Sequence, residues 1–389
     1  FRFGNSIKFR IDRLTIKSKY YMPFTSYFLL NPLIFSIIFN LRLFFKIRSI
    51  NEVNDKNEKG FGIGSVNKII NKWCKKYNLD ENSFFKNNKL EKNVMTIIDE
   101  EKAEKFSSQL KQGIEVAGGS VANSTVGFAS LSGKPAFIGK IKDDNLGKSF
   151  STSLSNAGVF YKTKPITDGP GTARSFIFVT PDAQRTMNTY IGACSLLSPK
   201  DMDEKIIKNS KITFLEGYVW EEDLAKESLV KAAEIARKAG NKVALTLSDP
   251  FCVKKHRLEF KELIKKNIDI LFANEFEVKE LCQTEDLEES AKEISNMIEI
   301  VAITRSEKGA KIYNAKEAVE IKAKVFNKVK DTTGAGDLFA AGFLYGLTKK
   351  FSILKSGKIA SITAGEIISH FGARPETNLA NLIQKELTE

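Results

Sequence analysis

Short apolar runs alternate with longer amphipathic stretches over the second half of the chain, and this rhythm restricts the possible fold more than any other feature. Each run has the length of a strand, and each intervening stretch has the apolar spacing of a helix. Such alternation is typical of an α/β fold with a largely parallel sheet, because each helix returns the chain to the edge where the strands begin. The expected strands are 211–215, 242–247, 268–273 and 298–304, and the expected helices are 221–239, 257–265, 275–283 and 287–297.

Polar residues follow three of these expected strands at the point where each strand ends. They lie in the segments 246–249, 272–275 and 303–306. In parallel α/β sheets, ligands bind in the crevice outside the carboxyl ends of the strands. We therefore expect these polar residues to meet at one edge of the sheet and to form part of a ligand site.

The segment 331–337, with the sequence DTTGAGD, precedes an apolar stretch that is typical of a buried helix. Small residues at this point allow the amides of Gly334, Ala335 and Gly336 to converge at the positive end of the helix dipole, which favours an anion. Asp337 places a carboxylate beside that site, where it can take a proton while the amides hold a transferring phosphoryl group. The alternative is a glycine-rich turn in which Asp337 is an ordinary helix cap.

This segment resembles the C-terminal signature of the PfkB/ribokinase family of sugar and nucleoside kinases, and the resemblance extends from about residue 60 to the C-terminus. It implies that Asp337 is the catalytic base and that Gly334, Ala335 and Gly336 form the anion hole. It also implies a ribokinase-like three-layer α/β/α sandwich with a mostly parallel sheet and a small β-sheet lid. The expected cofactors are ATP and Mg²⁺, with a monovalent cation as a further candidate.

A second motif, Gly118 to Asn123, combines two glycines with an amide side chain before a helix of small residues. Gly118 and Gly119 allow the backbone to approach a ligand, and Asn123 offers both a donor and an acceptor. A helix start packed tightly against a strand is the alternative. Together with 137–147, this segment resembles the N-terminal signature of the family, which implies that Gly118, Gly119 and Asn123 contact the acceptor substrate. We expect the charged residues that follow to be structural: Lys140, Asp143 and Asp144.

Asn274 and Glu277 are three residues apart at the expected start of a helix. Their oxygen atoms suit Mg²⁺, which keeps most of its water ligands in proteins. The alternative is a capping arrangement in which Asn274 caps the helix and Glu277 reaches back. The resemblance implies that this pair positions Mg²⁺ and the phosphates, largely through water.

Two further segments resemble the nucleotide-binding parts of the family. In 304–310, Thr304 and Gly309 match the positions that border the ATP phosphates and ribose, whereas Arg305 is equally well explained as a solvated loop residue. The tail 369–375 would lie near the adenine, with His370 as a packing or hydrogen-bonding residue rather than an acid or base.

Two alternating segments, 175–180 and 186–191, flank the polar turn 181–184 and predict a β-hairpin. The hairpin resembles the lid of the family, and the expected strand 94–99 would complete it, so that lid strands lie around 90–99 and 172–192. The hairpin most resembles that of the adenosine-kinase-like branch, which favours an adenosine-like acceptor. Because lid strands can also pair between protomers, we expect a monomer or a homodimer.

The chain departs from the family pattern at Ile69, where the resemblance would place an aspartate that binds acceptor hydroxyls. An apolar side chain loses two charge-assisted hydrogen bonds, each worth on the order of 1.5–3 kcal/mol. The alternatives are therefore a catalytically impaired nucleotide-binding homologue, or a fructokinase- or ribokinase-type sugar kinase.

A dinucleotide-binding dehydrogenase does not fit, because the glycine pair at 62–64 is not followed by a third glycine at the required spacing.

The first 58 residues form an atypical extension, and we expect the kinase domain to occupy residues 59–389. The span 20–45 is long enough for a membrane helix, but Asn31, Pro32, Asn40 and Arg42 interrupt it. A membrane or targeting segment, a loosely packed extension and a non-native sequence are all compatible with this composition. We favour the last, because nothing in the segment resembles the kinase family.

The net charge of +13 is unevenly distributed, since residues 1–50 hold nine basic residues and one acidic residue. The remaining surplus of +5 gives no reason to expect a nucleic-acid partner. Widely spaced cysteines and only two histidines argue against a zinc site or a disulfide framework, and favour the reducing cytoplasm. We expect only small-molecule partners, namely ATP and the acceptor, and no membrane association unless the N-terminal segment is genuine. The residues concerned are Cys74, Cys194, Cys252, Cys282, His256 and His370.

Overall fold

A computed structural model gives the fold and describes the backbone of residues 7–11, 14–18, 85–88, 90, 95–109, 115–179 and 185–388. The chain separates into two compact units, Phe1–Phe61 and Gly62–Glu389. In the first unit, β1 (Ile7–Ile11) and β2 (Leu14–Ser18) form an antiparallel hairpin. All other described elements belong to the second unit.

Several sequence predictions lie outside the described residues. They concern Ile69, the strand and turn at 61–64, the apolar span 20–45, the hairpin turn 181–184, and the boundary between residues 58 and 59. These stay predictions.

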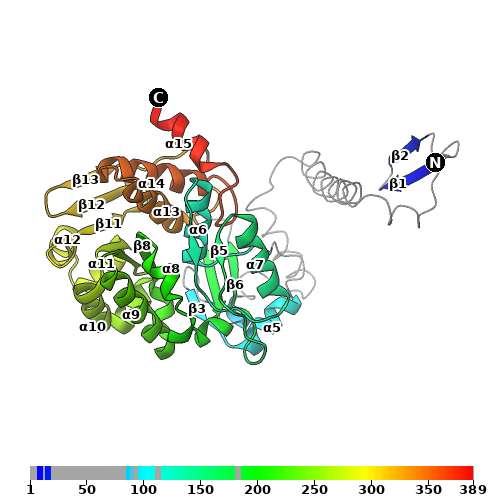
Figure 1. The fold of residues 1–389 in the computed structure, drawn as a ribbon, viewed down its shortest axis with the longest axis horizontal. Helices are drawn as coiled ribbons and strands as arrows, with labels where there is room; N and C mark the ends of the chain where they lie inside the picture. Colours follow the sequence, from blue (N-terminus) through cyan, green and yellow to red (C-terminus); the bar gives the residue numbers. More distant parts are fainter. Residues whose placement is uncertain are drawn as a thin grey trace. The chain divides into compact units, whose positions relative to one another are not determined.

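The second unit is built on a six-stranded sheet with the strand order β13-β12-β11-β10-β9-β8 (Figure 1). The strands β8 to β11 are parallel, as the alternation of strands and helices predicts. β12 and β13 are antiparallel to their neighbours, because the short connections that precede them leave no room for a crossover. The strands are β8 (Ile212–Glu216), β9 (Lys242–Thr246), β10 (Ile270–Asn274), β11 (Ile300–Thr304), β12 (Ala310–Asn314) and β13 (Ala318–Ile321).

Helices cover both faces of this sheet and make it the middle layer of a sandwich. Side chains alternate between the faces, so Leu271 and Ala273 of β10 pack into one apolar core, whereas Ile270 and Phe272 pack into the other. The first core includes α9 (Asp223–Lys238), α10 (Pro250–Asn267), α11 (Glu275–Cys282) and α12 (Leu287–Ser295). The second includes α13 (Ala335–Thr348) and α14 (Ile353–Ile367), with Phe128 of α6 (Ser120–Ser130) packed against it. The predicted ribokinase-like α/β sandwich is confirmed.

Close contact between α6 and α13 brings two distant parts of the chain together. A Cβ atom on Gly127 would lie 2.4 Å from Leu338 Cδ1 and 3.1 Å from Ala341 Cβ. A larger residue at this crossing would therefore require Leu338 and Ala341 to move. The two helices begin at the two motifs that the sequence singles out, and their contact places those motifs side by side (Figure 1).

A separate three-stranded sheet has the order β3-β7-β6, with β3 (Met95–Ile97), β6 (Arg174–Val179) and β7 (Arg185–Tyr190). The predicted hairpin is β6 and β7, and the strand expected at 94–99 is β3, which runs parallel to β7. α5 (Glu100–Gln109) covers one face, where the ring of Phe106 lies 5.4 Å from that of Phe176. The register aligns Met95, Met187 and Ile177 in one row on the opposite face.

Two elements differ from the sequence predictions in length. α10 begins at Pro250 rather than at residue 257, because Asp249 Oδ1 accepts a hydrogen bond of 2.7 Å from Phe251 N and caps the helix. The helix is kinked at His256, which has φ −117° and ψ 24°. The sequence of Ala136 to Gly139 also favours a strand, which in the structure is only β4 (Ala136–Phe137), paired with β5 (Phe160–Tyr161).

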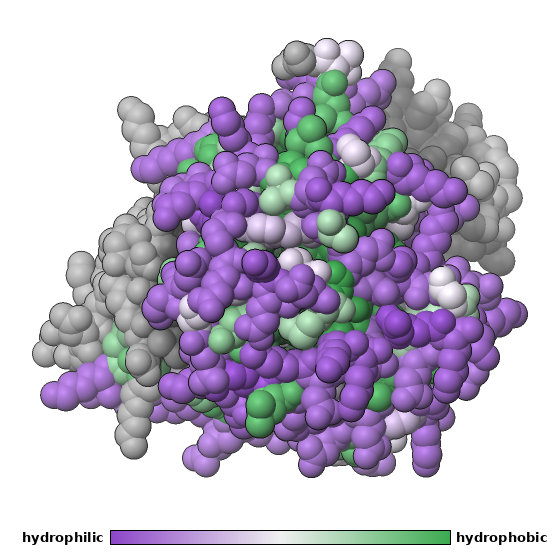
Figure 2. All heavy atoms as spheres, turned by 90° about the vertical axis from the view of Figure 1, so that its left-hand side faces the viewer, coloured by the Kyte–Doolittle hydropathy of each residue, from purple (hydrophilic) through white to green (hydrophobic). Residues whose placement is uncertain are grey.

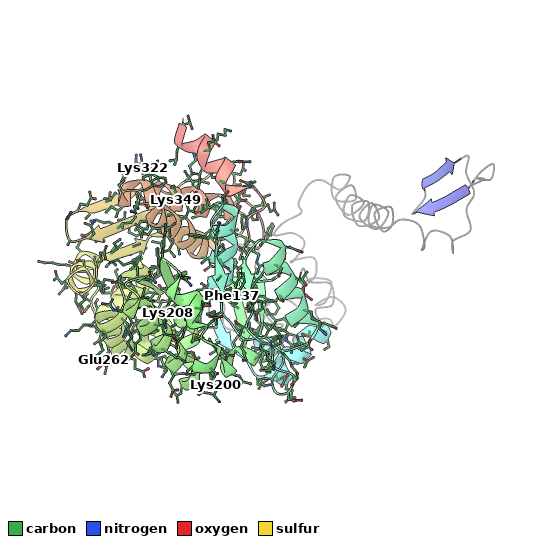
Figure 3. All side chains as sticks on the ribbon, viewed as in Figure 1. Phe137, Lys200, Lys208, Glu262, Lys322 and Lys349 are labelled. Atoms are coloured by element: carbon green, nitrogen blue, oxygen red, sulfur yellow. The ribbon has the colours of Figure 1, made fainter. Side chains whose placement is uncertain are left out.

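The ring of Phe137, labelled in Figure 3, packs at 5.8 Å from both Phe150 and Tyr161. The remaining elements are α7 (Asn145–Asn156), α8 (Glu204–Lys208), α15 (Leu379–Thr388), and the short 3₁₀ helices η1 (Gly192–Leu196), η2 (Pro199–Asp201), η3 (Gly217–Glu221) and η4 (Ser306–Lys308). On the face drawn in Figure 2, hydrophilic side chains surround small apolar areas. In the described part of the chain, no helix combines the length and the apolar character that a membrane span requires.

Candidate active site

The N-terminus of α13 begins with a backbone turn instead of a capping side chain. Gly334 has φ 84° and, as a glycine, brings no side chain that could cap the first turn. A Cβ atom at Gly334 would lie 2.9 Å from both Cα and Cβ of Ala373, so this position needs glycine for its conformation and for its packing. Ala335 N donates to Thr332 O at 3.2 Å, which engages one of the three predicted amides inside the turn. The amides of Gly334 and Gly336 are the better candidates for an anion.

The carboxylate of Asp337 is held by the helix that starts at the other motif. Ser120 Oγ donates to Asp337 Oδ1 at 2.7 Å, and Asn123 Nδ2 donates to Asp337 Oδ2 at 2.9 Å. Ser124 Oγ donates to the main-chain oxygen of Asp337 at 2.9 Å. These contacts unite two segments that the sequence analysis treated separately, and they assign Ser120 and Ser124 a function that it missed.

Asn123 has one atom left for a ligand. Its Oδ1 is buried and makes no hydrogen bond to any described residue. Buried amide oxygens nearly always have a partner, because leaving one unpaired costs about 1–3 kcal/mol. A donor on a bound molecule would supply that partner, in agreement with the predicted contact between Asn123 and the acceptor. Gly119, which precedes the helix with φ 100°, brings the backbone to the same place, and Gly118 adjoins it with no atom within 4 Å of a Cβ built there.

Glu216 is a site residue that the sequence analysis did not identify. It ends β8, and its Oε2 accepts a hydrogen bond of 3.4 Å from Val121 N at the start of α6. Burial, followed by the charge of Asp337, raises the pKa of Glu216 to about 7. The available signal was its position, since a carboxylate at the carboxyl end of a parallel strand lies where such sheets bind ligands.

Asn274 and Glu277 form the capping arrangement that the sequence left as an alternative to metal binding. Asn274 Oδ1 accepts from the amides of Phe276 and Glu277 at 2.9 Å, and Glu277 Oε2 accepts from Asn274 N at 3.0 Å. Asn274 Nδ2 donates to Glu277 Oε1 at 2.6 Å, so both carboxylate oxygens are engaged. Burial, with a smaller contribution from the charge of Asp249, raises the pKa of Glu277 to about 7.

Direct Mg²⁺ ligation does not fit this pair, because a metal would have to displace the bonds that begin α11. The described residues also contain no group of three or more His, Cys, Asp or Glu side chains that could hold a metal ion. The water-mediated contact implied by the family resemblance therefore stays a prediction.

Thr304 and Gly309 lie at the two ends of the connection between β11 and β12. Thr304 is paired with Asn274 in the parallel register, so the predicted nucleotide and metal residues are neighbours. Gly309 has φ 82°, and a Cβ atom there would lie 2.0 Å from Ile321 O, which explains the glycine by packing. Arg305 Nη2 lies 3.3 Å from Glu320 Oε1, which favours its interpretation as a loop residue.

Asp331 begins the phosphate motif and joins it to the loop after α14. Its Oδ1 accepts from Thr333 N at 2.9 Å, and its Oδ2 accepts from Gly372 N at 3.2 Å. Thr333 Oγ1 is buried and makes no hydrogen bond within the described part of the chain.

The charged residues that the sequence analysis expected to be structural have structural partners. Lys140 pairs with Asp201, and Lys148 pairs with Asp143 at 3.1 Å. Asp144 caps α7 by accepting a hydrogen bond of 2.7 Å from Gly147 N.

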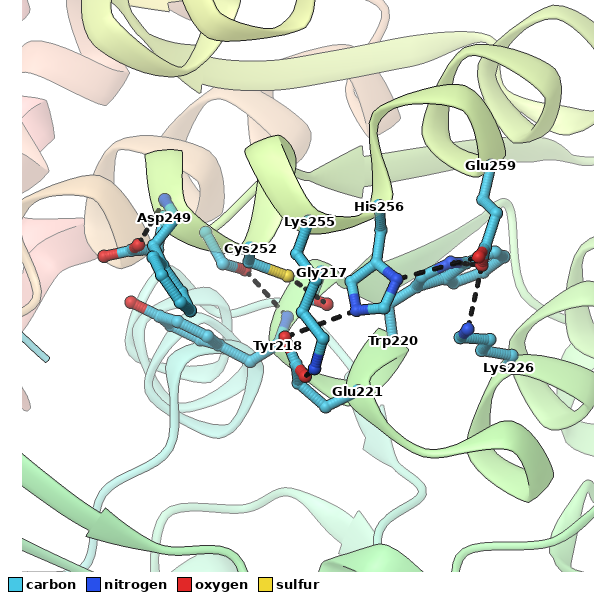
Figure 4. A network of polar contacts seen from close by, with 12 residues as sticks. Gly217, Tyr218, Trp220, Glu221, Lys226, Asp249, Cys252, Lys255, His256 and Glu259 are labelled. Atoms are coloured by element: carbon cyan, nitrogen blue, oxygen red, sulfur yellow. Dashed lines mark hydrogen bonds and ion pairs between the residues drawn. The ribbon is translucent and has the colours of Figure 1, made fainter. Parts of the chain in front are cut away.

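A second polar cluster lies between α9, η3 and α10 (Figure 4). His256 stands at the kink of α10, with Nε2 3.4 Å from Glu221 Oε1 and Nδ1 3.7 Å from Glu259 Oε1. Glu259 Oε2 accepts from Trp220 Nε1 at 2.7 Å and lies 2.9 Å from Lys226 Nζ. The members of this cluster belong to none of the motifs identified in the sequence.

Comparison with known proteins identifies one family. The description "pfkB family carbohydrate kinase" matches residues 91–379. A 5-dehydro-2-deoxygluconokinase from Bacillus licheniformis is 29% identical over 262 residues, which cover 65% of this chain and 80% of the relative.

Two solved structures are more similar in sequence. A probable sugar kinase protein from Rhizobium etli is 42% identical with a TM-score of 0.76, over 79% of this chain and 93% of that chain. An adenosine kinase from Sinorhizobium meliloti is 40% identical with a TM-score of 0.76, over 79% of this chain and 94% of that chain.

Proposed function

Because this chain belongs to the pfkB family of carbohydrate kinases, we propose that it transfers the γ-phosphoryl group of ATP to a hydroxymethyl group of a nucleoside or sugar, with an adenosine-like acceptor favoured. One observation carries this proposal. The carboxylate of Asp337 lies at the uncapped start of α13 and is oriented by Ser120 and Asn123 from the other motif. A general base and an anion site therefore adjoin each other, as phosphoryl transfer requires.

In the proposed reaction, Asp337 accepts the proton of the acceptor hydroxyl as that oxygen forms a bond to the γ-phosphorus. The bond between the γ-phosphorus and the bridging oxygen of ADP breaks, and ADP leaves with its electron pair. The amides of Gly334 and Gly336 hold the negative charge of the transferring group, supported by the dipole of α13. The hydrogen bonds from Ser120 and Asn123 keep the carboxylate in line with the hydroxyl.

A kinase of this family uses a divalent metal with ATP, and we propose Mg²⁺. When bound, the ion neutralises charge on the phosphates. Asn274 and Glu277 would position it through water, because their own hydrogen bonds leave no direct ligand. A monovalent cation stays a further candidate.

The acceptor side of the proposed site consists of Gly118, Gly119, Asn123 and Glu216. The side-chain oxygen of Asn123, the two carboxylate oxygens of Glu216 and the exposed backbone at the two glycines suit a molecule with several hydroxyl groups. The apolar row of Met95, Met187 and Ile177 supports a nucleobase as part of that molecule, because a flat ring packs well on such a surface. The relative from Sinorhizobium meliloti, called an adenosine kinase, points to the same branch.

An acceptor screen tests this proposal. ADP release is measured with purified full-length protein, ATP and Mg²⁺, in the presence of adenosine, ribose, fructose or 5-dehydro-2-deoxygluconate. We expect the highest kcat/KM with adenosine. Turnover of a sugar but not of adenosine would show that the acceptor is a sugar rather than a nucleoside. ATP binding without turnover of any acceptor would favour the impaired homologue, which the Ile69 departure suggests.

A cytoplasmic location and a monomeric or homodimeric state also stay predictions.

A further inference from the structure

The loop between α14 and α15, residues 368–378, packs against the phosphate motif, and we call it the C-terminal loop. Gly372 N donates to Asp331 Oδ2 at 3.2 Å. Ala373 lies against Gly334 so closely that a Cβ atom on the glycine would approach it to 2.9 Å. A displacement of this loop would therefore release the turn that directs the amides of the motif.

A buried carboxylate on α14 holds this loop from beneath. Glu366 is 3% exposed, and its Oε1 accepts from Glu376 N at 3.0 Å, Thr377 N at 3.0 Å and Thr377 Oγ1 at 3.1 Å. Its Oε2 lies 3.3 Å from His370 Nε2. Burying a carboxylate is costly unless it is paired and hydrogen-bonded, and here all the partners belong to the C-terminal loop.

His370 lies beside Glu366 inside the protein. Its Nδ1 lies 3.2 Å from Phe371 O and 3.8 Å from Glu376 Oε1, so two carboxylates and a carbonyl face the ring. Burial alone lowers the pKa of His370, but Glu366, Phe371 O and Glu376 outweigh it and raise the pKa above its ordinary value. Burial likewise opposes ionisation of Glu366, but His370 and Thr377 lower its pKa overall.

We infer that Glu366 and His370 form a positioning pair, which holds the C-terminal loop against Asp331 and Gly334 and thereby fixes the amides that bind the transferring phosphoryl group. Neither side chain contacts a reacting atom. This inference rests on the proposed kinase function and adds a requirement to it. The sequence predicted only packing or hydrogen bonding for His370 and did not mention Glu366.

The chain supplies a matched control for this pair. His256 is also a buried histidine between two glutamates, Glu221 and Glu259 (Figure 4). It braces η3 and α10 rather than the C-terminal loop. Replacing either histidine by glutamine removes a buried ring, so general destabilisation would affect both variants alike.

The first experiment compares Glu366→Gln, His370→Gln and His256→Gln with the wild type, using the acceptor that it turns over. We expect kcat to fall about 10–100-fold in the first two variants, because small misplacements of catalytic groups have effects of this size. We expect a change of less than about threefold in the KM for the acceptor, and near-normal kcat in His256→Gln. The double variant Glu366→Gln/His370→Gln should lose no more activity than the worse single variant, since the two side chains act as one unit.

The second experiment needs no turnover. Hydrogen exchange of the amides in 331–337 should accelerate at least about tenfold in Glu366→Gln and stay at the wild-type rate in His256→Gln. Unchanged exchange, or kcat values within twofold of wild type in both loop variants, would overturn the positioning pair. An equal loss in His256→Gln would do the same, because it would reduce the effect to general destabilisation. Absence of turnover in the wild type alone would instead count against the proposed function, with the exchange result still deciding the pair.

Discussion

The helices α11 and α13 both begin near the carboxyl ends of the parallel strands, yet their N-termini are capped in different ways. At α11, Asn274 and Glu277 satisfy the first amides with their own side chains. At α13, a left-handed Gly334 opens the helix, and the acidic residue in its first turn is bound by α6 instead. The first helix start is capped by its own side chains, whereas the acidic residue at the second is bound by another helix.

We assign a structural role to the start of α11 and propose catalysis at the start of α13. The carboxylate of Glu277 accepts its hydrogen bonds from Asn274, at the start of its own helix. Asp337 instead accepts hydrogen bonds from Ser120 and Asn123 of α6, which fix its position at the start of α13. Anion binding and proton transfer can therefore coexist at one helix terminus.

The strongest test of this contrast is Asp337→Asn. We expect kcat to fall by about 10²–10⁴-fold, because the amide cannot take a proton, while ATP binding and the folded state persist. Steady-state kinetics and an ATP-binding titration measure the two effects. Asp143→Asn, which changes an exposed carboxylate paired with Lys148, is the matched control and should keep its activity. Near-normal turnover in Asp337→Asn would remove Asp337 from the mechanism.

A second test compares the pH dependence of stability in Glu277→Gln and the wild type. The folded pKa of Glu277 is raised from 4.5 to about 7, so its contribution to stability is present below the ordinary pKa and is lost as pH rises through 7. At about 1.4 kcal/mol per pKa unit, this loss is on the order of 3 kcal/mol. Urea unfolding at pH 5, 6, 7 and 8 should therefore give a smaller decrease with pH in Glu277→Gln. Parallel curves for both proteins would contradict a buried, near-neutral cap at α11.

The smallest effect is expected at the glycines that open α13. Gly334→Ala should lower the free energy of unfolding by about 1–2 kcal/mol from the backbone alone, because alanine disfavours the left-handed region. Contact with Ala373 adds to this cost. Gly336→Ala should leave stability unchanged, since a Cβ atom there would meet no atom within 4 Å. Chemical denaturation distinguishes the two, and equal stability losses would show that the open helix start has no special geometry.

Much of the sheet could be predicted from the sequence, because strand and helix periods are local properties of the chain. The four parallel strands of the six-stranded sheet and the hairpin of β6 and β7 appear where apolar spacing placed them. The antiparallel β12 and β13 were missed, although the short connection at Gly309 already excluded a helical crossover.

The site was less predictable, because its contacts join residues that are far apart in the sequence. Asp337 and Asn123 were each identified, but nothing local to either segment indicated that one binds the other. Glu216 and Glu366 belong to no motif, and their significance comes from burial and from partners on other elements. Conversely, the capping alternative for Asn274 and Glu277 was readable, since an N-cap acts within one helical turn.

The contact between Ser120 and Asp337 also has a consequence for the order of synthesis. The two residues are 217 positions apart, and the hydrogen bond between them needs α6 and α13 to be packed together. At about 5–20 residues per second, a ribosome needs roughly 10–40 seconds to add the intervening residues. During that interval Ser120 and Asn123 have been synthesised, whereas α13, the helix with which they pair, has not. Catalytic competence therefore arrives late and all at once, after the central sheet has been translated.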